Sequence, residues 1–148
     1  MSTDLGGLTP ETPAVARPIA ADLVARFEDG TVPPWAFGHR EHVYVAWVYL
    51  RAEPFEDAAP RFVKNLKAFA ARHGASSKYH ATITWALLAL IAEAIDACPE
   101  LDFEALLAAR PELLAARATL GTLYDASVLA SDRARRVPLL PSPGLRRR

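Results

Sequence analysis

The sequence predicts an all-α fold: a single-domain helical bundle of about five to six helices with a proline-rich leader and tail. Apolar residues make up 51% of the 148 residues, and only seven are glycine. Ala and Leu, both strong helix formers, dominate the apolar part. Apolar positions also recur at spacings of three and four, the period of an amphipathic helix. A chain of this length buries about two thirds of its unfolded surface as one domain.

The proline distribution sets the expected boundaries. Residues 1–17 contain two prolines and two adjacent glycines without an apolar period, so we expect a flexible leader. Residues 18–136 form the expected helical domain. Residues 137–148 contain three prolines and end in three arginines, and we expect an extended or disordered tail.

Local start and stop signals divide the domain into helices. Ser76 and Ser77 are ready N-caps, Asp102 is another, and Gly74 is a typical C-terminal stop. Pro60 is tolerated only near a helix start. The expected helices cover 18–28, 39–52, 54 or 60 to 73, 78–97, 103–110 and about 111–123, with a shorter turn near 131–136.

Composition narrows the possible partners. The chain has 17 basic and 17 acidic residues, which argues against a broad electrostatic footprint for nucleic acid or an anionic membrane. No apolar run reaches ~18 residues, so no membrane span is expected. The lone Cys98 excludes an internal disulfide and fits a cytoplasmic location.

The four histidines are the most informative residues. His39 and His42 lie on the core-facing stripe at the start of the second helix, His73 ends the third, and His80 opens the fourth. Helices joined by short loops are usually antiparallel neighbours, so an up-down-up arrangement brings these helix ends together. The histidines lie at the same level along the bundle if the third helix starts at Pro60, because that helix then has the same length as the second.

Converging imidazoles suggest two kinds of chemistry. Helix N-termini and partial burial both keep imidazole neutral near pH 7, as a metal ligand or a general base requires. We therefore expect His39, His42 and His80 to ligate one transition metal ion such as Zn, Fe, Cu or Ni. Alternatively, His80 acts as a general base, with Tyr79 as proton donor and Thr84 as a positioning hydroxyl.

A loop with two prolines, residues 30–38, precedes the histidine pair. Its Trp35 and Phe37 are costly to leave in water, so we expect them to fold over the histidines as a flap. With His73 and Lys78 they complete an expected pocket for a small-molecule ligand.

The alternative function is a non-catalytic interaction module. In that hypothesis the histidines are structural, and the protein works by forming a homodimer or binding a partner. Ring nitrogens bonded to loop carbonyls would favour this alternative. Rings open to a polar cavity would favour a small-molecule enzyme, either a metal-dependent hydrolase or oxidase or an enzyme with a histidine general base.

The run from His39 to Val43, with histidines at its first and fourth positions, leads into a helix and is followed by residues 78–84, Lys-Tyr-His-Ala-Thr-Ile-Thr. This combination resembles a family of small uncharacterised bacterial all-helical proteins, over about residues 35–140. The resemblance implies the histidine positions and no established activity. This chain has Ala81 where that pattern has an acidic residue.

Overall fold

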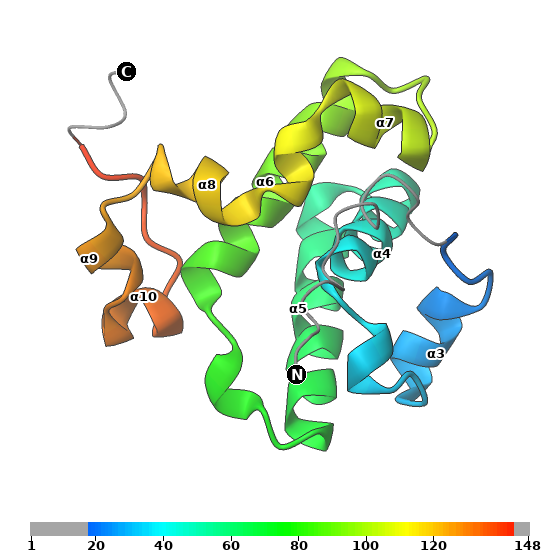
Figure 1. The fold of residues 1–148 in the computed structure, drawn as a ribbon, viewed down its shortest axis with the longest axis horizontal. Helices are drawn as coiled ribbons and strands as arrows, with labels where there is room; N and C mark the ends of the chain where they lie inside the picture. Colours follow the sequence, from blue (N-terminus) through cyan, green and yellow to red (C-terminus); the bar gives the residue numbers. More distant parts are fainter. Residues whose placement is uncertain (1–17, 144–148) are drawn as a thin grey trace, which may run out of the picture.

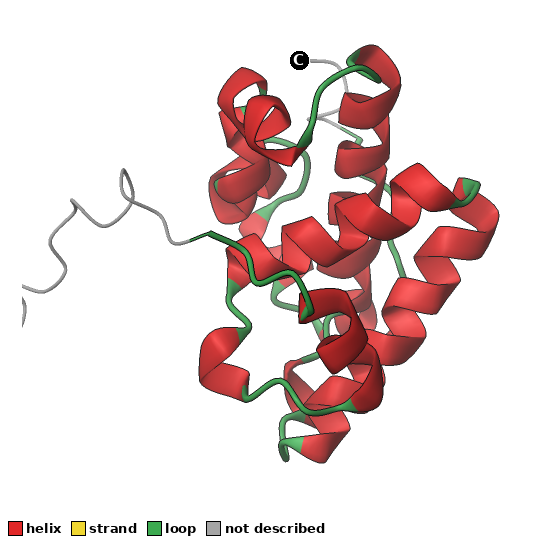
Figure 2. Ribbon diagram, turned by 90° about the vertical axis from the view of Figure 1, so that its right-hand side faces the viewer, coloured by secondary structure: helices red, strands yellow, loops and turns green. Residues whose placement is uncertain are grey.

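The structure is a computed structural model that describes residues 18–143, so the expected leader and the end of the expected tail lie outside the described residues. All regular elements in this range are helical (Figures 1 and 2), which confirms the all-α prediction. The α-helices are α3 (Leu23–Asp29), α4 (His39–Ala52), α5 (Phe55–Arg72), α6 (Ala81–Ala97), α7 (Phe103–Ala109), α8 (Ala116–Gly121), α9 (Ala126–Leu129) and α10 (Asp132–Arg136). Three 3₁₀ turns are η1 (Pro34–Ala36), η2 (Ser76–Lys78) and η3 (Pro111–Leu114). No helix in residues 18–143 is both long enough and apolar enough to cross a bilayer.

The elements differ from the expected ones mainly in the third and sixth helices. Helix α4 has the predicted bounds, but α5 begins at Phe55 and contains Pro60. Pro60 is tolerated because it is exposed, so water can satisfy the carbonyl that its missing N–H leaves free. The predicted helix over about 111–123 divides into η3 and α8 around Ala115. The unpredicted α9, together with α10, which was expected only as a short turn, brings the described range to eight α-helices rather than five to six.

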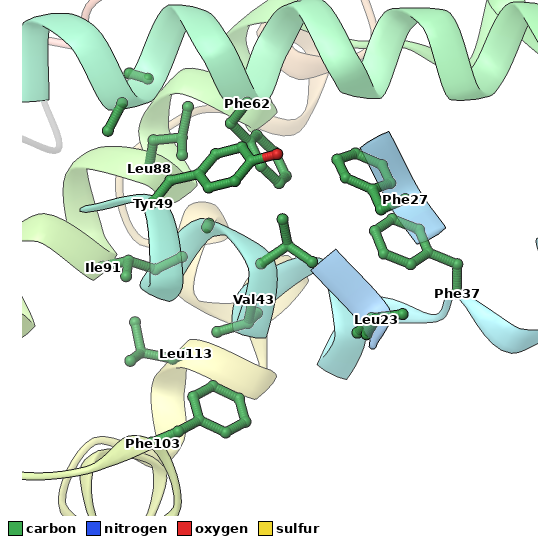
Figure 3. Close-up of a cluster of buried hydrophobic side chains, with 14 of the residues drawn as sticks. Leu23, Phe27, Phe37, Val43, Tyr49, Phe62, Leu88, Ile91, Phe103 and Leu113 are labelled. Carbon is green, nitrogen blue, oxygen red and sulfur yellow. The ribbon is translucent and has the colours of Figure 1, made fainter. Parts of the chain in front are cut away.

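The main core lies between α4, α5 and their neighbours (Figure 3). Four phenylalanines form its aromatic part: Phe27 of α3 stacks on Phe37 at 4.6 Å between ring centroids, and Phe62 and Phe69 of α5 lie close to them. Apolar side chains of α6, α7 and η3 complete it, among them Leu88, Ile91, Phe103 and Leu113. Burial of these side chains supplies the main stabilising free energy.

A polar network closes the core beside Tyr49. The Tyr49 hydroxyl donates to the carboxylate of Glu28, and Asn65 donates to the same hydroxyl at 3.1 Å. Arg61 pairs with Glu28 at 2.6 Å and lies over the Tyr49 ring. Burial raises the pKa of Tyr49, so the phenol remains a neutral donor.

The C-terminal part, residues 115–143, packs on the first turns of α6 and away from the main core (Figure 1). Its own buried apolar side chains are Leu120, Tyr124 and Ala134. The expected tail continues from α10 without regular secondary structure up to Pro143, and hydrogen bonds hold it in place. Thr82 donates to the carbonyl of Val137 at 2.8 Å and accepts the N–H of Leu139 at 3.0 Å.

Candidate functional site

His80 caps helix α6. Its Nδ1 accepts the backbone N–H of Ile83 at 3.1 Å, and its Nε2–H donates to the carbonyl of Leu129 at 2.7 Å. The ring is buried, with 8% of the residue's surface exposed. His80 therefore does the capping that Ser76 and Ser77 were expected to do, because those serines lie in the separate turn η2. Both ring nitrogens are engaged, so a metal ion could bind this ring only if one of these hydrogen bonds broke.

His39 and His42 are also held by backbone carbonyls. The His39 Nε2–H donates to Leu113 at 3.0 Å, and the His42 Nδ1–H donates to Gly38 at 2.7 Å. The His42 ring lies against Phe37, with 4.4 Å between centroids. Burial lowers the pKa of His42, and the neighbouring His39 lowers it further, although the hydrogen bond to Gly38 opposes this. The neutral state expected for this imidazole is therefore favoured.

The predicted metal cluster is not found in the part of the chain that the structure describes. No three His, Cys, Asp or Glu side chains there are grouped closely enough to hold an ion. His39 is tied to η3, whereas His80 is tied to the end of α9. One physical reason lies in α5, which begins at Phe55 and at 18 residues is longer than the 14-residue α4, so the helix ends do not lie at the same level. The start of α6 instead lies beside α9 and α10, away from α3 and η1 (Figure 1).

The other predicted catalytic and pocket residues surround α5 and η2. Tyr79 is half-buried under the ammonium group of Lys67, which lies 4.9 Å from the ring centroid. Burial raises the pKa of Tyr79, and the side chains of Trp85 and Thr84 only partly offset it. His73 meets Phe69 edge to face, with 4.6 Å between ring centroids, and its Nε2 is buried without a hydrogen-bond partner among the described residues. Lys78 is exposed.

The expected aromatic flap is only half formed. Phe37 is buried in the aromatic core as predicted, with 4% of its surface exposed. Trp35 is 83% exposed, which contradicts the expectation that it folds back over the histidines. The reason is η1: Pro34 opens a 3₁₀ turn with about three residues per turn, so Trp35 and Phe37, two residues apart, point to different sides.

Trp35 instead forms part of the wall of a pocket of about 170 Å³ between α3, η1 and the start of α4. The apolar part of the wall includes Pro18 and Val32, and the charged part is formed by Asp22, Arg26 and Glu41. Gly30 ends α3 and adopts the left-handed backbone conformation, at φ +82°. None of the four histidines lines this pocket.

We call this pocket the Trp35 pocket. Its three charged side chains differ in the hydrogen bonds that they make within the chain. Arg26 is occupied, because its guanidinium donates to the carbonyl of Thr31 at 2.9 Å. One carboxylate oxygen of Glu41 accepts the N–H of Gly38 at 2.9 Å, which orients the side chain. Asp22 precedes α3 but makes no side-chain cap. Two carboxylates against one guanidinium leave the pocket with a net negative charge beside an exposed indole ring.

The sequence pattern indicates Trp35 as a pocket residue but does not indicate Asp22, Arg26 or Glu41. Helical periodicity predicted that Glu41 points away from the histidines. Its position opposite α3 depends on the fold and has no signal in the local sequence. The proline pair before Trp35 was the local sequence signal for this site, because two prolines make the turn that carries Trp35 rigid.

Comparisons with known proteins give no further guidance: the chain matches no family model, no curated protein and no solved structure.

Proposed function

We propose that the protein is a non-catalytic binding module whose Trp35 pocket receives a cationic side chain of a partner. The observation that supports this most directly is the 83% exposure of Trp35 at the wall of a pocket that also contains Asp22 and Glu41. The indole face attracts cations more strongly than any other side-chain ring. The two carboxylates add an opposite charge at the same place.

The hydrogen bonds of the histidines support the same proposal. His39, His42 and His80 each donate a ring N–H to a backbone carbonyl. Such bonds fix a ring in place and are typical of structural histidines. Under the proposal, these residues join loops to helices, and the surface around Trp35 performs the function.

Titration of the full chain with N-acetyl-arginine amide, followed by NMR at the Trp35 indole N–H, tests the proposal. We expect saturable shifts of that resonance, which a Trp35→Phe variant assigns. N-acetyl-glutamine amide, which is similar in size but neutral, should produce none. The Trp35→Ala variant, followed at the backbone amide of Ala36, should bind about 2- to 30-fold more weakly, as expected for a cation–π contact.

A matched pair of carboxylate variants isolates the contribution of charge. Glu41→Gln keeps an oxygen for the N–H of Gly38 but removes the negative charge, so we expect weaker arginine binding with unchanged helicity. Glu93→Gln removes an exposed carboxylate of α6, outside the pocket, and should bind as the wild type does. An arginine probe that shifts no resonance of the pocket would overturn the proposed function.

The second candidate function is the small-molecule enzyme, with His39 and His42 as its centre. The supporting observation is that a backbone carbonyl holds one nitrogen of each ring, while no hydrogen bond within the described residues engages the other. A ring held in this way is suited to ligate Zn, Fe, Cu or Ni, or to act as a general base. About one metal ion per chain in untagged protein, lost in His42→Gln, would support this candidate; metal-free protein would reject its metal form.

A further inference from the structure

We infer that the cationic side chains that enter the Trp35 pocket belong to α10 of a second copy of this chain. This inference rests on the proposed function, and it adds the identity of the partner. The supporting observations are the distribution of charge along the chain, the exposed arginines of α10, and the positions of the two surfaces in the fold.

Although the net charge of the chain is zero, acidic and basic residues are unevenly distributed along the sequence. Residues 18–114 contain nine Lys or Arg and thirteen Asp or Glu, for a net charge of −4. Residues 115–143 contain four Arg and two Asp, for a net charge of +2. The C-terminal part is therefore attracted to the acidic part that holds the Trp35 pocket.

The arginines of α10 are available for such a contact. Arg133 and Arg136 are exposed, and neither forms an ion pair with another described residue. Arg135 is used within the chain, because it donates to the carbonyl of Ser77 at 3.1 Å. Beyond α10, Val137 is 47% exposed and Leu140 is 76% exposed, so the basic surface has an apolar border.

This combination of charge and apolar surface is complementary to the Trp35 pocket. The pocket presents Asp22 and Glu41 beside the apolar wall that includes Pro18 and Val32. A guanidinium on the Trp35 ring would gain both the cation–π contact and the carboxylates. The apolar side chains beyond α10 would then cover the exposed indole and remove this large apolar ring from water.

The two surfaces lie at opposite ends of the longest axis, with α3 at the right of Figure 1 and α10 at the left. Helix α10 therefore cannot reach the pocket of its own chain, and a second copy must supply it. A two-fold dimer would contain the contact twice, with the α10 of each copy at the pocket of the other.

Sedimentation velocity of the full chain tests the inference. We expect the wild type to dimerise at low ionic strength, with a Kd that rises about tenfold or more in ~0.5 M salt because exposed charges are screened. The double variant Arg133→Ala/Arg136→Ala and the Trp35→Ala variant should both be monomeric. The Arg117→Ala control removes an exposed arginine of α8 in the same basic part and should dimerise as the wild type does.

Mixing the two monomeric variants identifies the contact itself. The α10 variant keeps an intact pocket, and the Trp35→Ala variant keeps an intact α10, so an equimolar mixture should form a heterodimer with one of the two contacts. A wild type that binds the arginine probe but stays monomeric would overturn the inference and leave the proposed function standing. Dimerisation that survives both variants would also overturn it, since the interface would then lie elsewhere. Failure of the probe to bind would overturn the proposed function.

Discussion

At the scale of single residues, His42 shows how burial determines a protonation state. Its ring lies against Phe37, and the carbonyl of Gly38 accepts both its Nδ1–H and its backbone N–H. Burial is the largest influence and lowers the pKa of His42 in the folded chain. The unfolded chain, in which the ring is hydrated, keeps a pKa of about 6.5.

A pH dependence of stability follows. Below about pH 6.5 the unfolded chain binds a proton at His42 before the folded chain does, so the free energy of unfolding falls as the pH falls through this range. Above that pH the contribution of the neutral ring is fully present. Urea unfolding between about pH 7.5 and 5.5 should show this slope for the wild type and a smaller slope for His42→Gln. Equal slopes would show that His42 does not titrate as described.

At the scale of elements, the start of α6 depends on a histidine where Ser, Thr, Asp or Asn is usual. His80 caps the helix through Nδ1 and reaches α9 through Nε2. A shorter side chain, such as Ser or Asn, could cap the helix at this position but could not reach α9. His80 thus connects two elements that lie 49 residues apart in the sequence.

Two substitutions separate these contacts. His80→Asn keeps an N-cap oxygen but does not reach Leu129, so we expect it to cost about 1 kcal/mol, the net contribution of one hydrogen bond. His80→Ala loses the cap as well and should cost about 2 kcal/mol. Urea unfolding of both variants measures the difference, with Ser77→Ala as a control that we expect to be neutral because Ser77 caps no helix. An Asn variant as unstable as the Ala variant would argue against the capping role.

At the scale of the whole molecule, residues 18–114 and residues 115–143 differ in how they are held. The first part surrounds the aromatic core, whereas the second joins α6 through His80, Thr82 and the small buried set around Tyr124. The tail returns over this part: Tyr124 donates to the carbonyl of Leu139 at 2.8 Å, and Ser142 accepts the N–H of Asp125 at 3.1 Å. Regions with few buried apolar contacts open first, so the C-terminal part should be the less stable one.

Native-state hydrogen exchange tests this difference. Thr82→Val keeps the shape of a buried side chain but removes both hydrogen bonds to the tail. We expect the amides of Leu139 and Ser142 to exchange about tenfold faster in this variant, corresponding to about 1.4 kcal/mol, while the amides of α4 keep their protection. Equal acceleration in α4 would show that the chain opens as one unit.

Much of the secondary structure could be predicted because it depends on local interactions. The predicted bounds of α4 are those observed, and Asp102 caps α7 through the N–H of Ala105 as expected. Of the two predicted starts of α5, the one near Pro54 is observed and the one at Pro60 was wrong, because Pro60 lies inside the helix. The start of α6 was misplaced, because a histidine took the place of a serine cap. The cost of Pro60 within a helix depends on its exposure to solvent, and the benefit of His80 as a cap depends on a carbonyl that is distant in the sequence.

The helical class, the order of the main helices and the inward position of Phe37 all follow from the local sequence. In contrast, three features depend on how the helices pack: the backbone carbonyl that each histidine meets, the burial of Thr82 under the tail, and the exposure of Trp35 beside Asp22 and Glu41. The two groups differ in the sequence separation of the interacting residues. Helix formation depends on residues three or four apart, whereas a site depends on how α3, α4 and α6 pack against segments dozens of residues away.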